Sequence, residues 1–221
     1  MREETSQRGL PTTTGFAARE ALAMLRKHNI ATAPLLLRAS LSEHGFARVA
    51  DGNGLPQRVS AIGQCKFLEY AAEAMDDSVF GLHLAKQIDP RDVGIYFYAS
   101  SAARDVGEAL ALFSRYCRIV NEAFRVTQRS ADSAIVFEYV GLPRYAARHN
   151  MEYVVAAIAA ALRTMSGRKL APSESRLRTQ PEFGRAGIRA VLRLSGRVWR
   201  TEHRVSDLSR CAPPSADHRR S

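Results

Sequence analysis

The period of the apolar residues changes along this chain, and that change limits the folds it can adopt. Up to about residue 120, apolar side chains recur three or four positions apart, as in amphipathic helices. Residues 123–128 and 134–140 then alternate around a polar turn, and this pattern predicts a β-hairpin. The helical period returns over residues 145–165. We therefore expect an α+β fold, with a helical N-terminal half and a small, mostly antiparallel sheet packed against long helices.

Capping residues and turn formers divide the helical part into segments. Ser60 can cap a helix, Asp105 or the residue before it can start a later one, and turn formers cluster between Asp51 and Pro56. The short apolar segment 80–88 stops before a proline, and residues 93–103 fit neither period, so neither segment is assigned. The helices predicted here cover residues 16–28, 34–45, 60–76 and 106–120. Weaker strand signals lie within residues 172–181, 188–194 and 198–205.

The net charge of +10 is concentrated near the C-terminus. Residues 151–221 hold 14 basic and 6 acidic side chains, so the remainder of the chain is close to neutral. A basic segment can bind phosphates without sequence preference, although a solvated tail explains the same composition. We expect a flexible N-terminal arm over residues 1–14, one folded domain over 15–181, and a divergent, partly disordered basic segment over 182–221.

Neither secretion nor membrane insertion is predicted. A membrane-spanning helix needs about 20 apolar residues, whereas the longest apolar run, Tyr153–Leu162, has ten residues. The three cysteines are an odd number at wide spacings, which suits neither a disulfide framework nor a metal motif. The first 30 residues contain no signal peptide. We expect a cytoplasmic protein without a membrane partner.

The sequence lacks the motifs that would indicate catalysis or cofactor binding. It contains no glycine-rich phosphate loop and no nucleophile elbow, and its six histidines form no metal-ligand pattern. The acidic pairs Asp76 with Asp77 and Asp89 with Asp92 lie in turn-like segments, where their pKa values would stay ordinary. We therefore expect no catalytic residue, no metal, no cofactor and no enzymatic activity.

Short motifs follow one another in a definite order along the chain. They are the apolar residues Leu22, Leu25, Ile30, Pro34 and Leu36; Arg58-Val59-Ser60; Phe80-Gly81-Leu82-His83-Leu84-Ala85; Gly94 with Tyr98; Val106-Gly107-Glu108-Ala109-Leu110 with Arg115-Tyr116; and Phe137-Glu138. In this order they resemble the arabinose-binding-like N-terminal sensing domain of AraC-type transcription regulators, from about Gly15 to Pro181. The resemblance implies a domain that senses a small-molecule effector and forms a homodimer, or a heterodimer with a related regulator.

The C-terminal part departs from the pattern of this family. Members usually have a histidine before the proline that corresponds to Pro181, and Gln180 stands there instead. The two helix-turn-helix units with which the family reads promoter DNA are not found in the sequence. The resemblance thus implies a sensing domain truncated before its DNA-binding domain, with no sequence-specific DNA binding by this chain alone.

Five polar residues are the candidate ligand contacts, and we expect their pocket between the hairpin and the helices. Each has an alternative explanation: the tyrosines as core aromatics, Arg125 and Glu138 as a cross-strand surface pair, and His149 as part of a first helical turn. Nothing in them selects a sugar over a hydrophobic effector. The five candidates are Tyr98, Tyr116, Arg125, Glu138 and His149.

Two other functions compete with effector sensing. The chain can be a ligand-free interaction remnant that associates with an intact homologous regulator, using an amphipathic helix such as 106–120 as its contact face. Alternatively, the arginine-rich C-terminal segment can bind nucleic acid without sequence preference, in which case binding would collapse with salt. The sequence alone does not separate the first of these from effector sensing.

Overall fold

The computed structural model describes residues 10–46, 58–89, 95–129, 134–140, 147–166, 174–178 and 189–193, and the structural statements below concern these residues. The helices are α1 (Phe16–Lys27), α2 (Ala33–Arg38), the 3-10 helix η1 (Glu43–Phe46), α3 (Ala61–Ala74), α4 (Phe80–Lys86), α5 (Ile95–Ser101), α6 (Val106–Val120) and α7 (Arg148–Ser166). The strands are β1 (Thr12–Thr13), β2 (Val59–Ser60), β3 (Phe124–Arg129), β4 (Ala134–Tyr139), β5 (Glu174–Arg178) and β6 (Arg189–Arg193). The predicted α+β class is confirmed.

The larger sheet is antiparallel and has the strand order β3-β4-β6-β5. Strands β3 and β4 form the predicted hairpin, in which Val126 is opposite Phe137. Strand β4 is interior, because β6 pairs with its other edge, and Val136 is buried although it lies on the opposite face from Phe137. Strand β6 comes from the segment predicted to be divergent, beyond residue 181. The sheet is therefore incomplete without it.

The termini of the helices follow local side-chain chemistry. The Ser60 hydroxyl accepts a hydrogen bond from the Gly63 N–H at 3.2 Å, and the Asp105 carboxylate accepts one from the Glu108 N–H at 2.8 Å. The predicted N-cap at Ser60 is confirmed, and of the two positions left open for the later helix, Asp105 is the cap. The helix predicted over 34–45 is shorter, because α2 ends at Arg38 and Ser40 adopts a left-handed conformation with φ of 55°.

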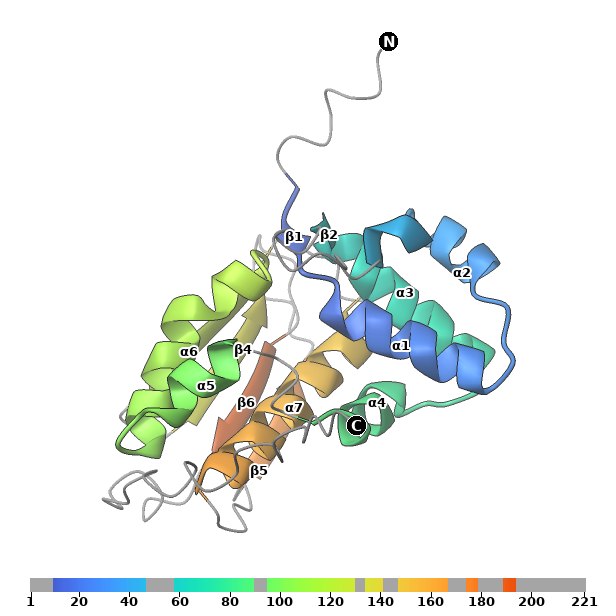
Figure 1. Ribbon diagram of the computed structural model, residues 1–221. Helices are drawn as coiled ribbons and strands as arrows, with labels where there is room; N and C mark the ends of the chain where they lie inside the picture. The colour runs from blue at the N-terminus through green and yellow to red at the C-terminus, as the bar shows by residue number, and fades with distance from the viewer. Residues whose placement is uncertain are drawn as a thin grey trace, which may run out of the picture.

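Helix α7 runs between two apolar clusters (Figure 1). One cluster is built from α1 to α4, to which α7 contributes Tyr153. The other joins the hairpin to α6, and α7 adds Met151, Ile158 and Leu162 to it. Val154 packs against both clusters. Helix α7 thus links the N-terminal helices to the sheet.

Arg58 connects three parts of the chain that are distant in sequence. Its guanidinium donates to the Thr12 hydroxyl at 2.6 Å, to the Thr12 carbonyl at 3.0 Å and to the Ile119 carbonyl at 2.8 Å. It also lies 3.5 Å from the Glu122 carboxylate. These bonds hold β1 against the end of α6, although Thr12 falls inside the arm predicted to be flexible.

Replacement of Arg58 by methionine is expected to lower the free energy of unfolding by about 1–2 kcal/mol, because hydrogen bonds to a charged group are lost at a partly exposed site. Urea denaturation of the purified variant measures this change. Arg118→Met removes an exposed arginine near the end of α6 that makes none of these bonds, and we expect it to change stability by less than about 0.5 kcal/mol. Equal effects of the two substitutions would contradict the assignment.

Two of the three cysteines are buried, free thiols, Cys65 and Cys117. Burial raises the pKa of Cys65 to about 12, so this thiol stays protonated. Cys211 lies outside the described residues. Among the helices that the structure describes, none has the length and apolar character needed to cross a membrane.

Candidate functional site

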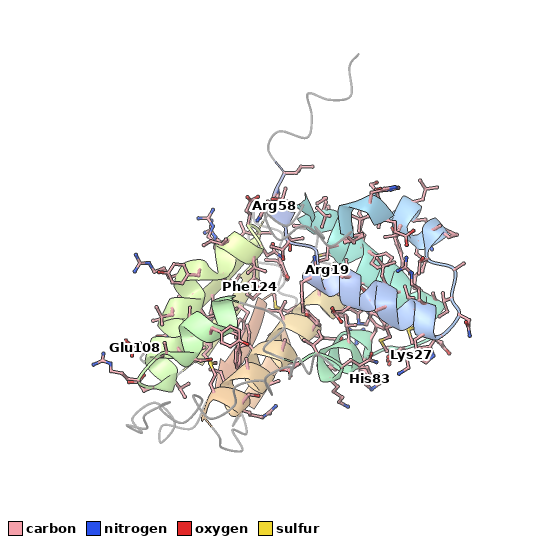
Figure 2. The ribbon with its side chains drawn as sticks, in the orientation of Figure 1. Arg19, Lys27, Arg58, His83, Glu108 and Phe124 are labelled. Carbon is pink, nitrogen blue, oxygen red and sulfur yellow. The ribbon has the colours of Figure 1, made fainter. Side chains whose placement is uncertain are left out.

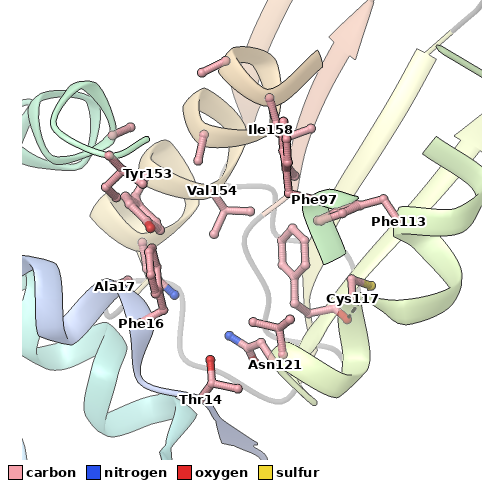
Figure 3. A pocket seen from close by; sticks show the side chains of 18 of the residues that line it. Thr14, Phe16, Ala17, Phe97, Phe113, Cys117, Asn121, Tyr153, Val154 and Ile158 are labelled. Atoms are coloured by element: carbon pink, nitrogen blue, oxygen red, sulfur yellow. Dashed lines mark hydrogen bonds between the residues drawn. The ribbon is translucent and has the colours of Figure 1, made fainter. Parts of the chain in front are cut away.

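A cavity of about 280 Å³ lies among α1, α6, α7 and the start of the hairpin (Figure 3). This is the region where the sequence predicts a pocket. Most of its wall is apolar, and the largest contributions come from α6 and α7. Apolar side chains on the wall include Phe16, Phe97, Leu110, Phe113, Phe124, Val154, Ile158 and Leu162.

Small residues on α7 make room for this cavity. Ala157, Ala160 and Ala161 recur at helical spacing and line the same wall. Opposite them, α6 presents the apolar stripe that the sequence predicts, with Leu110, Phe113 and Cys117 on the cavity side. A helix rich in alanine thus leaves a space where it faces larger side chains of α1 and α6.

A chain of buried polar groups reaches the cavity from the side of α3. The Gln64 amide donates to the Asn150 side-chain oxygen at 3.4 Å, and the Asn150 amide donates to the Tyr139 hydroxyl at 2.5 Å. The Asn121 amide donates to the same hydroxyl at 3.5 Å, and its oxygen accepts the Ala123 N–H at 3.1 Å. Burial raises the pKa of Tyr139, so its phenol remains neutral.

The hydrogen bonding of one residue in this network is incomplete. The Gln64 side chain is only 3% exposed, yet its Oε1 atom has no hydrogen-bond partner among the described residues. A buried acceptor without a partner costs about 1–3 kcal/mol, so such groups are usually satisfied. Gln64 is among the residues that line the cavity, and its Oε1 atom is enclosed by protein.

Arg19 is the single charged residue among the described residues that line the cavity. Its Nη1 donates to the Thr14 carbonyl at 3.1 Å, and its Cζ lies 5.5 Å from the centre of the Phe16 ring. Both contacts hold the guanidinium at the start of α1. The neighbouring Tyr153 hydroxyl is neutral, because burial and the charge of Glu20 raise its pKa more than the charge of Arg19 lowers it.

The cavity offers little to a nucleophilic reaction or a metal. The Cys117 sulfur lies 3.4 Å from the Ser114 carbonyl and 3.8 Å from that of Phe124, and burial raises the pKa of the thiol. A protonated thiol is a poor nucleophile and a poor ligand. Within the described ranges, no three acidic, histidine or cysteine side chains are grouped in a way that could hold a metal ion.

None of the five predicted contact residues lines this cavity. Tyr98 is 60% exposed on α5 and packs edge-to-face on Phe97, with 5.7 Å between the ring centres. Tyr116 is half-buried, and the guanidinium of Arg115 lies 5.5 Å from its ring. Arg125 and Glu138 are directly opposite each other on β3 and β4. Contact of these residues with a ligand stays a prediction that the cavity does not support.

His149 belongs to a separate, buried cluster where α7 begins. Its Nδ1 lies 3.1 Å from the Glu152 carboxylate, and its backbone N–H donates to Glu69 at 3.0 Å. Arg148 also donates to Glu152, at 2.9 Å, and to the Ser78 carbonyl at 3.0 Å. The cluster fastens the first turn of α7 to α3 and to the start of α4, so its role in the described structure is to position helices.

The two carboxyl groups of this cluster are shifted in opposite directions. Burial acts to raise the pKa of Glu152, but hydrogen bonds from His149 and Arg148 outweigh it and lower the pKa below its usual range. Burial raises the pKa of Glu69, against hydrogen bonds from the backbone of His149 and Arg148. A lowered pKa means that the Glu152 carboxylate stabilises the fold at neutral pH and loses this effect as the pH falls through the folded-state pKa. The raised pKa of Glu69 has the opposite effect: its carboxylate destabilises the fold at neutral pH, and protonation at lower pH removes that cost.

Glu152→Gln is therefore expected to lower the free energy of unfolding by about 1–2 kcal/mol at neutral pH, and by less at an acid pH low enough to protonate the carboxyl in the folded state as well. Urea denaturation at the two pH values tests this expectation. Glu73→Gln is the matched control, because Glu73 is exposed and its ion pair with Arg38, at 3.6 Å, lies on the surface. A stability difference independent of pH would refute the role given to the Glu152 charge.

Of the residues that the sequence did not single out, only Gln64 carries a recognisable signal. Gln64 is an amide within an apolar helical run, where an aliphatic residue would be expected, whereas Asn150 lies in the polar first turn of α7 and is buried all the same. Such polar interruptions indicate a buried hydrogen-bond network. Arg19 carries no comparable signal, because an arginine in an amphipathic helix usually faces solvent.

One protein family matches the chain: the profile of the arabinose-binding N-terminal domain of AraC transcription regulators covers residues 30–197. No curated protein matches. A mutant H-NOX from T. tengcongensis is 13% identical, with 83% of this chain and 97% of that chain covered and a TM-score of 0.51. An oxygen-binding H-NOX domain related to soluble guanylate cyclases, in its oxygen complex, is 12% identical, with 86% and 100% covered and a TM-score of 0.51. At this identity the similarity concerns the fold alone.

Proposed function

The chain belongs to the family with the arabinose-binding N-terminal domain of AraC transcription regulators, and we propose that it senses a small effector in the cavity between α1, α6 and α7. The observation that carries this proposal is the cavity itself, whose mostly apolar wall includes a few polar side chains, among them Gln64, Asn121 and Asn150. Apolar walls with a few convergent polar groups are the usual construction of small-molecule sites.

The position of the cavity suggests how an effector acts. Its wall takes Ala17 and Tyr153 from the N-terminal cluster, and Leu110, Cys117 and Phe124 from the sheet cluster. An effector bound there would contact both clusters and favour one arrangement of them over another. Its influence is limited to the difference between its affinities for the two arrangements.

Haem is a poor candidate for this effector, although structures of the H-NOX family contain it. Haem iron in proteins is usually held by histidine, cysteine thiolate, methionine or tyrosinate. No histidine is among the described residues of the cavity wall, so Met165 has no histidine with which to share an iron. The Cys117 thiol and the buried Tyr153 phenol are protonated, and the Tyr139 hydroxyl is engaged by Asn121 and Asn150. These side chains are therefore poor ligands for haem iron, and we propose an organic effector instead of haem.

The proposal also covers association and location. We propose a cytoplasmic, non-enzymatic domain that pairs with a second copy of itself or with a related regulator. Ile119 on α6 is 53% exposed, which gives this helix an apolar contact for a partner. Two buried free thiols are compatible with a reducing compartment.

A thermal-shift screen of the purified chain against sugars, amino acids and organic acids tests the proposal. A ligand present at about 100 times its Kd stabilises the folded state by about 2.7 kcal/mol, which raises the Tm of a domain of this size by about 5–10 °C. If no compound shifts a cooperative melt and the chain associates with itself or with a related regulator, the ligand-free interaction remnant is the better description. Sedimentation at several protein concentrations measures that association.

A further inference from the structure

Much of the hydrogen-bonding capacity of the cavity wall is used within the protein, and this limits the ligands that the cavity can bind. We infer that it takes an uncharged, largely hydrocarbon molecule with one polar end, such as a medium-chain alcohol or a bicyclic aromatic alcohol. The inference rests on the proposed function and names the class of its effector. It follows from the bonds of the polar wall groups, the nearby charges and the volume of the cavity.

Three amide side chains and one phenol of the wall form a single network. The Tyr139 hydroxyl accepts from the amides of Asn150 and Asn121, at 2.5 Å and 3.5 Å. The Asn150 oxygen accepts from Gln64, and the Asn121 oxygen accepts from the Ala123 N–H. The Gln64 Oε1 atom is enclosed by protein. A ligand that needs several hydrogen bonds would have to break this network and leave buried groups unsatisfied, so the wall favours a ligand with few polar atoms.

The charges beside the cavity do not single out an anion. Arg19 lines the wall, but its guanidinium already donates to the Thr14 carbonyl and lies against the Phe16 ring. Glu20 follows Arg19 directly, and it raises the pKa of the Tyr153 phenol more than Arg19 lowers it. A carboxylate that entered the cavity would lose its hydration without gaining a dedicated partner. An uncharged ligand avoids this cost.

The apolar wall and the volume set the size of the ligand. Phe97, Phe113, Val154 and Ile158 are among the apolar side chains of the wall (Figure 3). A dry apolar cavity of about 150 Å³ binds benzene, so the present volume of about 280 Å³ suits a molecule of roughly 10 to 12 non-hydrogen atoms. A pentose is of similar size, but it carries hydroxyl groups on almost every carbon, and burying them without partners is costly. The cavity thus disfavours a sugar despite the name of the family.

Isothermal titration of the full chain with matched compounds tests the inference. The probes are the straight-chain alcohols from n-hexanol to n-nonanol, together with octanoate and L-arabinose. We expect the affinity to rise about fourfold with each added methylene, and n-octanol to bind about ten times more tightly than octanoate. Tighter binding of octanoate, or of any sugar or amino acid, than of n-octanol would overturn the inference and leave the proposed function intact. If neither these probes nor the compounds of the thermal-shift screen bind to a cooperatively folded chain, both fail.

Leucine at position 161 is expected to shorten the longest alcohol that fits. Ala161 lines the cavity from α7, and a leucine there would occupy part of the space. We expect Ala161→Leu to weaken n-nonanol by about tenfold or more, while n-hexanol changes by less than about threefold. Ala157→Leu, on the same wall, repeats the test if the first variant does not fold. Ala159→Leu is the control, because Ala159 is not among the described residues that line the cavity. An unchanged dependence on chain length in both wall variants would show that the alcohols bind elsewhere, and would overturn the inference.

Removal of the Arg19 charge separates an uncharged ligand from an anionic one. Arg19→Gln should leave the ratio of the affinities for n-octanol and octanoate within about threefold, because no guanidinium–carboxylate contact is lost. Lys27→Gln is the control, since it removes the same charge from the far end of α1 (Figure 2). If Arg19→Gln weakens octanoate by about tenfold or more and Lys27→Gln does not, the guanidinium binds the carboxylate and the inference is overturned.

Discussion

Replacing Gly81 with alanine is expected to destabilise the protein by about 3 kcal/mol or more. An ideal Cβ at this position would lie 2.1 Å from the His149 carbonyl oxygen and 2.8 Å from the Glu152 Cβ. The closest atom belongs to the backbone, so no side-chain rotation can relieve the overlap. Helix α4 would have to move away from α7, and the hydrogen bonds of the His149 cluster would loosen with it.

Urea denaturation, followed by circular dichroism, measures the effect. Lys86→Ala is the control on the same helix, because Lys86 is exposed and alanine is a good helix former, so the change in stability should stay within about 0.5 kcal/mol. A Gly81→Ala variant that unfolds within about 1 kcal/mol of the natural chain would show that α4 and α7 are not packed as closely as described.

Phenylalanine at position 154 is expected to abolish effector binding. Val154 projects into the cavity from α7 (Figure 3), and a ring at this position would occupy the space that we assign to the effector. We expect the affinity to fall by about 100-fold or more, while the free energy of unfolding changes by less than about 1.5 kcal/mol, because the ring enters space that is already present.

Titration calorimetry with the tightest ligand from the thermal-shift screen gives the affinity, and a thermal melt gives the stability. Val154→Ala enlarges the same space and should weaken binding by about tenfold at most. If the phenylalanine variant still binds with the natural affinity, the effector occupies another part of the molecule. Comparison of the two variants separates loss of space from loss of a contact.

The order of helices and strands could be predicted because its causes are local. Ser60 and Asp105 cap helices through bonds to residues three positions away, and the alternation of Phe124 and Val126 marks a buried strand face. The family resemblance follows from the same local pattern and is confirmed by the match over residues 30–197. The predicted C-terminal end of α2 is wrong for a local reason as well: Ser40 adopts a left-handed conformation, which its residue type does not predict.

The candidate site could not be predicted residue by residue. Tyr98 and Arg125 have the right chemistry, but they lie on outer faces of α5 and β3. Gln64 and Asn150 stand 86 positions apart in the sequence and meet only because α3 and α7 pack together. The direction that a polar side chain faces depends on which neighbouring element covers its helix, and one chain's local pattern does not contain that information.

By itself, the sequence determined the α+β class, most element positions, the two N-caps and the family, because hydrophobic periodicity and capping act over a few residues. Only the tertiary structure decided that β6 lies between β4 and β5, that Gly81 lets α4 meet α7, and that residues of α1, α6 and α7 line one cavity. These features arise from contacts between distant segments, and their energies depend on packing and burial that exist only once the chain has folded.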